Sequence, residues 1–176
     1  MQFNLLITLC TKVCIIIKNC LFLYKIKLII MATKTLEKIS LKKDPTTFER
    51  VKITSSQDSA KYIRQFYSDD IEIFESFFIL LLNRQNKTIG YAKISQGGVA
   101  GTVVDGKIIL KYIVDTLASG VVLCHNHPSG NLNPSTQDLE LTNKIKKAVA
   151  LVDSVVLDHI ILTPDSFYSF ADNGLI

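Results

Sequence analysis

Four side chains near the middle of the chain have the types and the spacing of a hydrolytic metal site. His125 and His127 are one residue apart, and Ser135 and Asp138 follow them in the order H-x-H-x7-S-x-x-D. Imidazole nitrogens and carboxylate oxygens are common ligands of Zn²⁺, and three protein ligands leave one coordination position open. Zinc with an open position is a Lewis acid that activates water. The pattern therefore predicts a zinc site formed by His125, His127 and Asp138.

The residues around this motif predict a strand, a turn and a helix. Residues 120–124 form a short apolar run that is typical of a buried strand. Side chains alternate along a strand, so His125 and His127 should share one face and Asn126 the other. A Pro-Ser-Gly turn follows, and Asp138 falls in the first turn of the next helix, where the helix dipole favours a carboxylate. We therefore expect two imidazoles and one carboxylate to converge across the turn.

Each half of the motif also has a simpler interpretation. Ser135 and Asp138 fit a capping box, in which the serine caps the helix and the acid bonds back to it. His125 and His127 fit an accidental pair at a strand end, or core histidines with satisfied hydrogen bonds. The single consistent spacing of all four residues favours the metal site, and a capping Ser135 is compatible with that site.

The stretch His125–Gly130 reads His-Asn-His-Pro-Ser-Gly and resembles the JAMM (MPN+) motif of zinc-dependent metallopeptidases, more narrowly that of their RadC-like branch. The resemblance runs from about Val51 to the C-terminus and includes residues 157–162 and 168–175. It implies a RadC-like JAB/MPN+ domain over residues 51–176 with a deaminase-like α/β fold. It also implies a Zn²⁺ cofactor and hydrolysis of a peptide or isopeptide bond.

The resemblance further implies a glutamate base placed just before an early apolar strand. Glu75 precedes the apolar run 77–82 and matches this position best, and Glu72 is the alternative. The base would accept a proton from the attacking water and pass it to the leaving amine. Ser135 would donate a hydrogen bond to the developing oxyanion. Without the zinc motif, both glutamates would be interpreted as solvent-facing charges at a strand entrance.

Two further residues lie beside the predicted site. His159 stands in the apolar run 155–162, which is typical of a buried strand. We interpret it as a structural histidine beside the core, with contact to a metal ligand or a substrate as the alternative. Cys124 precedes the first histidine, and strand alternation turns it away from the metal side. We interpret it as a small buried apolar residue and not as a ligand or nucleophile.

Residues 1–30 differ in composition from the rest of the chain. They contain no Asp, Glu, Gly or Pro, but four Lys and three of the four Cys. The lysines interrupt every apolar run short of the roughly 20 residues that a transmembrane helix needs, so we expect no stable membrane span. A helix on a membrane surface is an alternative. Because Met31 opens an ordinary polar arm over residues 31–50, we expect residues 1–30 to reflect an upstream start assignment, which a native peptide covering Phe3–Lys12 would contradict.

The charge of the chain lies mainly in this first segment. Removing its four lysines from the 20 Lys and Arg leaves 16 basic residues against 16 Asp and Glu. Binding to a phosphate backbone draws on an excess of basic residues. The balance gives a nucleic-acid partner no support and favours a peptide or isopeptide-linked protein as substrate. A single cysteine beyond residue 30 and the lack of a secretory signal favour a cytoplasmic, disulfide-free protein.

The order of patterns along the chain predicts an α/β fold with a mixed β-sheet flanked by helices. The expected elements are strands at 51–54, 77–82, 89–94, 97–104, 121–125 and 155–162, and helices at 55–67, 107–118 and 135–150. The strand at 97–104 should be bent by its glycines, and residues 83–87 should form a hairpin turn. Residues 31–70 show no glycine-containing helical hairpin of the kind that precedes the catalytic domain in full-length RadC-like proteins, which weakens a DNA role.

The sequence thus favours a JAMM-type zinc hydrolase, a metallopeptidase or isopeptidase, in which His125, His127 and Asp138 bind zinc. Two alternatives from other classes stay open. One is a non-catalytic or DNA-repair-associated interaction module with this fold, which predicts that metal is absent or that Glu75 is dispensable. The other is a zinc-dependent nuclease, which predicts DNA cleavage that is lost in Asp138→Ala.

Overall fold

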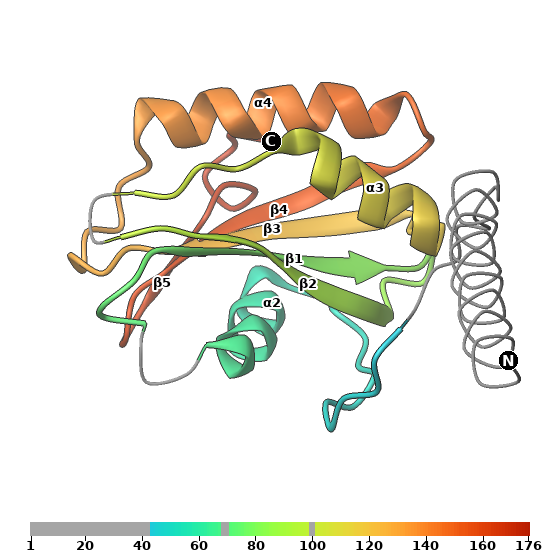
Figure 1. Ribbon diagram of the computed structural model, residues 1–176, viewed down its shortest axis with the longest axis horizontal. Helices are drawn as coiled ribbons and strands as arrows, with labels where there is room; N and C mark the ends of the chain where they lie inside the picture. The colour runs from blue at the N-terminus through green and yellow to red at the C-terminus, as the bar shows by residue number, and fades with distance from the viewer. Residues whose placement is uncertain (1–42, 68–70, 99–100) are drawn as a thin grey trace, which may run out of the picture. The chain divides into compact units, whose positions relative to one another are not determined.

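The computed structural model describes residues 43–67, 71–98 and 101–176, and Pro45–Ile176 form one compact unit. The interpretations of residues 1–30 and of most of the polar arm lie outside the described residues, and residues 43–50 contain no helix or strand. The elements are α2 (Ser56–Ile63), the 3-10 helix η1 (Arg64–Phe66), β1 (Ser76–Leu82), β2 (Thr88–Gln96), α3 (Gly106–Thr116), β3 (Gly120–Asn126), α4 (Thr136–Ala150), β4 (Val155–Leu162) and β5 (Phe167–Ser169) (Figure 1).

The strands form one mixed sheet in the order β2-β1-β3-β4-β5. β1 is antiparallel to both β2 and β3, β3 is parallel to β4, and β5 is antiparallel to β4. A parallel pair needs a crossover connection, and α4 supplies it between β3 and β4. The predicted mixed sheet flanked by helices is therefore confirmed, and the motif lies at the carboxyl end of its central strand.

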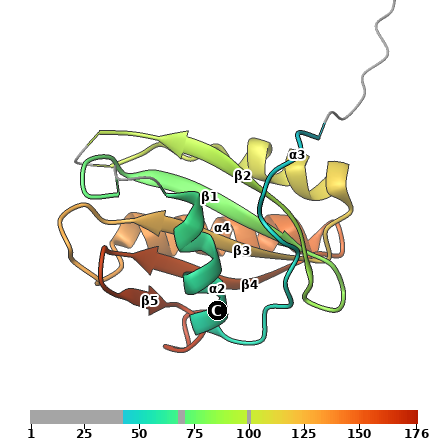
Figure 2. The same ribbon diagram turned by 90° about the horizontal axis from the view of Figure 1, so that it is seen from below.

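Helices cover both faces of the sheet. α3 and α4 lie on one face and α2 on the other (Figure 1), and Figure 2 shows the sheet from the α2 side. Side chains of β3 alternate between the two apolar cores, with Val121 and Leu123 in the core under α3 and α4, and Val122 and Cys124 in the core under α2. This alternation puts the His125 side chain on the α3/α4 face.

Polar caps fix where the helices begin. The side chains of Ser55, Asp105 and Ser135 each accept a backbone N–H from the first turn of α2, α3 and α4, respectively. Such caps typically stabilise a helix by about 1 kcal/mol. The cap at Ser135 also sets the position of Asp138, because it determines which residue occupies the third position of α4.

Several segments differ from their predictions. The expected strand at 51–54 is reduced to an isolated bridge between Lys52 and Lys87. The helix expected to reach residue 67 changes to a 3-10 turn after Ile63. β5 was not predicted, because three residues are too few to show alternation.

The glycine-bent strand expected at 97–104 is wrong for its described residues, which contain no strand. A Cβ on Gly97 would lie only 2.0 Å from the carbonyl oxygen of Gly101. Gly97 therefore permits a close approach between two backbone segments. Such an approach does not occur in a regular strand. Gly97 and Gly98 still exchange backbone hydrogen bonds with Glu75, at 2.8 and 3.1 Å.

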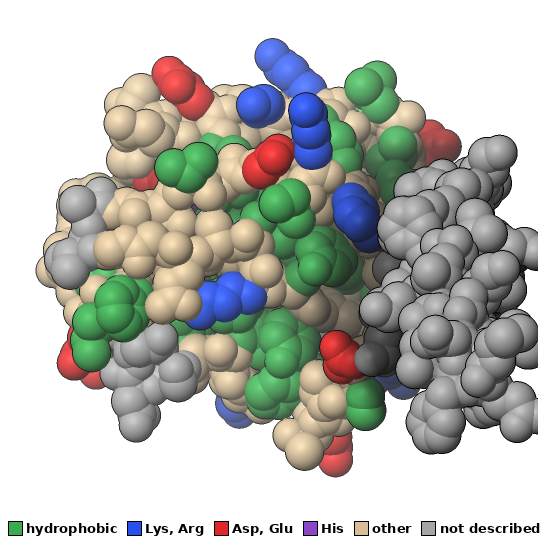
Figure 3. All heavy atoms as spheres, in the orientation of Figure 1, with side chains coloured by type: hydrophobic (Ala, Val, Ile, Leu, Met, Phe, Trp, Pro, Cys, Tyr) green, Lys and Arg blue, Asp and Glu red, His purple; other side chains and the backbone are tan. Residues whose placement is uncertain are grey.

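The described helices and surface bear on whether this part of the chain crosses a membrane or carries an excess of charge. No helix in the described ranges combines the length and the apolar character needed to cross a membrane. On the face shown in Figure 3, Lys and Arg side chains are interspersed with acidic and apolar side chains over the described elements. This mixture agrees with the balanced charge counted beyond residue 30.

Candidate metal centre

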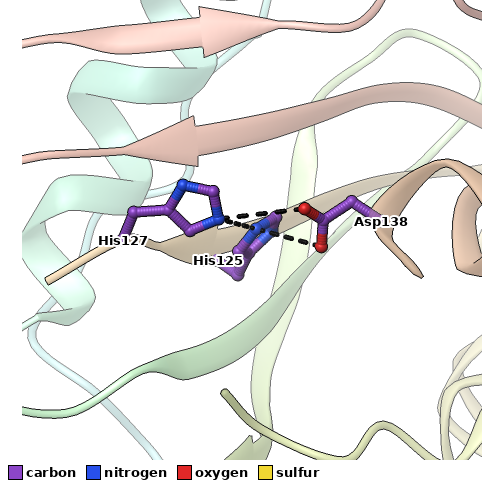
Figure 4. A group of neighbouring side chains, drawn as sticks. All are labelled: His125, His127 and Asp138. Atoms are coloured by element: carbon purple, nitrogen blue, oxygen red, sulfur yellow. Dashed lines mark hydrogen bonds and ion pairs between the residues drawn. The ribbon is translucent and has the colours of Figure 1, made fainter. Parts of the chain in front are cut away.

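The end of β3 presents two imidazoles to the same place. His125 is the penultimate residue of β3, and His127 follows the strand immediately. As expected from alternation, both rings lie on one side, and their Nε2 atoms are 3.0 Å apart (Figure 4). Their shared side is the α3/α4 face, from which the third side chain comes.

Asp138 reaches both histidines from the first turn of α4. Its Oδ1 lies 3.3 Å from Nε2 of His125, and its Oδ2 lies 3.8 Å from Nε2 of His127 (Figure 4). The ligand atoms of all three residues lie within 4.8 Å of one another. A tetrahedral zinc ion, with bonds of about 2.0–2.1 Å, separates its ligand atoms by about 3.3 Å. The three residues thus fit a zinc ion, and the predicted convergence across the turn is found.

The ring of His125 is held from behind by core residues. Its Nδ1 lies 2.8 Å from Nε2 of His159, which β4 contributes, and Nδ1 of His159 lies 2.6 Å from the hydroxyl of Thr142 on α4. The His125 ring also lies parallel to that of Phe77, and the His159 ring stacks on Phe170. Burial, helped by the neighbouring His125, lowers the pKa of His159 well below its usual value. His159 is therefore buried as predicted, but it also contacts a candidate ligand directly.

The ring of His127 is held by the turn that follows β3. Its Nδ1 lies 2.5 Å from the backbone carbonyl oxygen of Asn131. A carbonyl only accepts, so Nδ1 carries the proton and the Nε2 lone pair of the neutral ring faces His125 and Asp138. The turn is closed by a hydrogen bond from the Gly130 amide to the His127 carbonyl, and Gly130 has a φ of 76°.

Ser135 and Asp138 form a capping box that also serves the candidate site. The amide and hydroxyl of Ser135 both donate to Oδ2 of Asp138, at 2.8 and 2.6 Å, and the Asp138 amide donates to the Ser135 hydroxyl oxygen at 3.1 Å. The capping interpretation is confirmed, and it is compatible with the metal interpretation. Oδ2 is held by Ser135, which leaves Oδ1 directed at His125.

Asp138 is ionised near neutral pH, as a metal ligand must be. Partial burial alone would raise the pKa of its carboxyl group. The adjacent His125 imidazole and the two hydrogen bonds from Ser135 more than compensate, and they hold the pKa of Asp138 below its usual value. The electrostatics of the group therefore favour an anionic ligand beside the two imidazoles.

Glu75 and Glu72 lie in the segment that leads into β1. Glu75 directly precedes β1 and is half-buried, whereas Glu72 lies in an exposed turn. Phe77 is paired with His125 in the register of β1 and β3, so Glu75 is two residues from the pair that borders the site. The role of either glutamate as a base stays a prediction, and Glu75 has the better position for it.

Asn126 anchors the same segment from the other face of β3. It is fully buried, and its side chain accepts from the amide of Ser76 at 2.8 Å and donates to the carbonyl oxygens of Ile71 and Phe74 at 2.6 and 2.9 Å. Three hydrogen bonds therefore fix the segment that carries both glutamates. The sequence offered one signal for this anchor, since a polar residue expected to be buried needs such partners.

Cys124 has no place in the candidate site. It is buried in the core under α2, and its sulfur lies 3.7 Å from the hydroxyl of Tyr67. Burial raises the pKa of the Cys124 thiol to about 12. A thiol with this pKa stays protonated near neutral pH, and the prediction that Cys124 is a buried apolar residue is confirmed.

The fold and the side-chain group are those of a JAB-type domain: a mixed sheet between helices, with two histidines after its central strand and an aspartate in the next helix. Residues 53–175 match the family model of the RadC-like JAB domain, and the chain belongs to this family. The resemblance seen in the sequence is thereby confirmed.

Relatives of the chain carry the name UPF0758 protein. The one from Flavobacterium johnsoniae is 44% identical over 124 residues, which cover 70% of this chain and 53% of the relative. Those from Porphyromonas gingivalis and Coprothermobacter proteolyticus are each 40% identical, over 72% and 74% of this chain and 56% of each relative. The chain thus spans about half the length of the relatives it matches.

Proposed function

We propose that this protein is a zinc-dependent hydrolase that cleaves a peptide or isopeptide bond. One observation carries the proposal: the Nε2 atoms of His125 and His127 lie 3.0 Å apart, and the two carboxylate oxygens of Asp138 lie 3.3 Å from the first and 3.8 Å from the second. At least two of these atoms, Oδ2 of Asp138 and Nε2 of His127, are acceptors 3.8 Å apart, because the proton of His127 lies on Nδ1 and is donated to Asn131. Acceptors at such distances repel one another unless a cation lies among them.

The residues around the group supply the remaining functions. When bound, zinc supplies a Lewis acid that polarises the scissile carbonyl and acidifies water. His125, His127 and Asp138 hold it. Glu75 accepts the proton of the attacking water on its carboxylate and returns it to the leaving amine.

Ser135 is proposed to donate to the oxyanion that develops on the scissile carbonyl. Its single hydroxyl proton is directed at Oδ2 of Asp138 in the structure. Oxyanion stabilisation therefore requires the hydroxyl to rotate away from Asp138. The Ser135 amide can keep the Asp138 carboxylate in place during that rotation, because it donates to the same oxygen.

A protein substrate agrees better with the charge than a nucleic acid does. The chain beyond residue 30 has as many acidic as basic residues. A nuclease or a DNA-binding module normally has basic side chains gathered on one surface. An interaction module of the same fold would have no need for three ligand-type side chains whose ligand atoms lie within 4.8 Å of one another.

Elemental analysis of the purified full chain tests the metal. We expect about one zinc per chain, lost in Asp138→Ala and retained in Asp165→Ala, a matched control at an exposed turn. Absence of zinc after incubation with the metal at neutral pH would favour the interaction module.

Activity is then measured on fluorogenic peptide and isopeptide libraries with the zinc-loaded protein. We expect cleavage that is lost in Glu75→Gln although zinc is retained. Cleavage of DNA, lost in Asp138→Ala, with no cleavage of peptides would instead establish the nuclease alternative.

A further inference from the structure

A continuous line of buried hydrogen bonds joins the two elements that carry the candidate ligands. The hydroxyl of Thr142 donates to the backbone carbonyl oxygen of Asp138 at 2.6 Å. The same hydroxyl oxygen lies 2.6 Å from Nδ1 of His159, and Nε2 of His159 lies 2.8 Å from Nδ1 of His125. Thr142, His159 and His125 are all buried. The line therefore starts at the main chain of one ligand and ends on the ring of another.

The positions of the protons along this line follow from its first member. A threonine hydroxyl has one proton, and Thr142 gives it to the carbonyl of Asp138. Its oxygen can then only accept from His159, so Nδ1 of His159 carries a proton. Nε2 of a neutral His159 is an acceptor and must receive its hydrogen bond from Nδ1–H of His125. The lone pair of His125 then lies on Nε2, the atom 3.3 Å from Asp138.

The surroundings of His159 favour its neutral form. Its two ring nitrogens contact a hydroxyl and a second imidazole, neither of which carries a negative charge. Its ring contacts the aromatic ring of Phe77 in a T-shaped arrangement and stacks on that of Phe170. An imidazolium in such an apolar, enclosed place would lose its hydration without gaining an anionic partner.

We propose that His159, oriented by Thr142, is a positioning residue that fixes His125 in its Nδ1–H tautomer and so presents the Nε2 lone pair to the metal. The identity of the metal as zinc rests on the proposed function, whereas the tautomer of His125 does not. A hydrogen bond to the far nitrogen of a metal-binding imidazole commonly changes metal affinity by 10- to 100-fold. In this chain that partner is a second histidine, held in turn by the helix that carries Asp138.

The tautomer is measured first, on the metal-free full chain. Long-range ¹H–¹⁵N correlation spectra near pH 8 distinguish Nδ1–H from Nε2–H imidazoles, and the chain has only three histidines to assign. We expect His125 and His159 as Nδ1–H tautomers in the wild type. An Nε2–H tautomer of His125 in the wild type would overturn the proposal.

Three variants separate positioning from packing. His159→Phe keeps an aromatic ring in contact with Phe77 and Phe170 but removes the acceptor, so we expect His125 to shift toward its Nε2–H tautomer. His159→Gln offers a carbonyl oxygen to His125 and should restore the Nδ1–H form. Thr142→Val is nearly isosteric, and its loss of the hydroxyl should give a smaller shift of the same sign.

Zinc affinity, measured by competition with a chelator, is the second readout. We expect a 10- to 100-fold loss in His159→Phe, recovery to within about 3-fold of the wild type in His159→Gln, and a loss of a few-fold in Thr142→Val. Unchanged tautomer and affinity in His159→Phe would overturn the proposal. If His159→Phe does not fold, the comparison of His159→Gln with Thr142→Val tests the proposal. Equal losses of zinc affinity in these two variants would contradict the role of His159 as the acceptor.

The two proposals fail in different ways. A wild type that binds no zinc but shows the expected tautomers overturns the proposed function and retains the positioning role of His159. A wild type that binds zinc with the other tautomer overturns the positioning role alone.

Discussion

His125 and His127 are one residue apart, and yet different parts of the molecule hold them. The His125 side chain is 1% exposed and is fixed by His159 and by the core, whereas the His127 side chain is 15% exposed and is fixed by a local turn. One candidate ligand thus depends on the packing of β4 and α4, and the other on the backbone of a few consecutive residues. Substitutions that weaken metal binding equally should therefore differ in their effect on folding.

The largest effect expected from this difference is on stability in the absence of metal. His125→Ala leaves a cavity beside Phe77 and an unpaired nitrogen on His159, so we expect it to lower the free energy of unfolding by about 2–4 kcal/mol. His127→Ala removes a half-buried ring at a turn and should change the free energy by less than about 1 kcal/mol. Urea unfolding with EDTA measures both, and chelator competition should show at least a 100-fold loss of zinc affinity in each. Equal losses of stability in the two variants would contradict the view that the core holds His125 and a local turn holds His127.

Asn126 lies between the two histidines, but its substitution should lower the stability of the protein and leave the zinc affinity nearly unchanged. Asn126→Leu keeps most of the side-chain volume but leaves the amide of Ser76 and two carbonyls without their partner. We expect a loss of about 2–3 kcal/mol in stability and a change of less than about 3-fold in zinc affinity, because the side chain faces away from the ligands. Cleavage by an added protease at residues 71–75 should increase. A large loss of zinc affinity at normal stability would show that the two faces of β3 are coupled.

Acid should weaken the hydrogen bonds that the ionised Asp138 carboxylate accepts from Ser135 in the metal-free protein. The pKa of Asp138 is lower in the folded than in the unfolded chain, so its stabilisation is full above the unfolded value of about 4 and is lost as pH falls through the folded value. Asp138→Asn should therefore be about 1–2 kcal/mol less stable than the wild type at pH 7, and this difference should shrink steadily below about pH 4. Urea unfolding at pH 7, 5, 4 and 3 tests the trend. A difference that is constant with pH would contradict it.

The sequence predicted the convergence of His125, His127 and Asp138 better than it predicted the loops around them. The two histidines, the turn and the capping box depend on local spacing, and strand alternation alone placed His125 and His127 on one side. The mixed sheet followed from the order of apolar runs. The segment around Gly97 was not foreseen, because its conformation depends on contact with Gly101 and Glu75, which a pattern along one strand does not encode.

The residues that orient the candidate ligands could not be predicted from local sequence patterns either. His159 lies 34 residues from His125, and its contact with that ring exists only because β4 runs parallel to β3 in a particular register. The role of Asn126 depends likewise on the pairing of β3 with β1. Sequence spacing therefore identifies candidate metal ligands more readily than the residues that orient them.

The smallest effect expected concerns the turn that holds His127. Gly130 has a φ of 76°, and a Cβ added there would meet nothing within 4 Å, so Gly130→Ala strains the backbone without a clash and should cost about 1 kcal/mol. Because relief of that strain would move the Asn131 carbonyl, we expect zinc affinity to fall by about 3- to 10-fold. Gly174→Ala is the matched control, with a φ of 70°, open space and a place outside this turn. It should lose similar stability and keep its zinc affinity. Equal affinities in the two variants would mean that the ligand depends on the core more than on the turn.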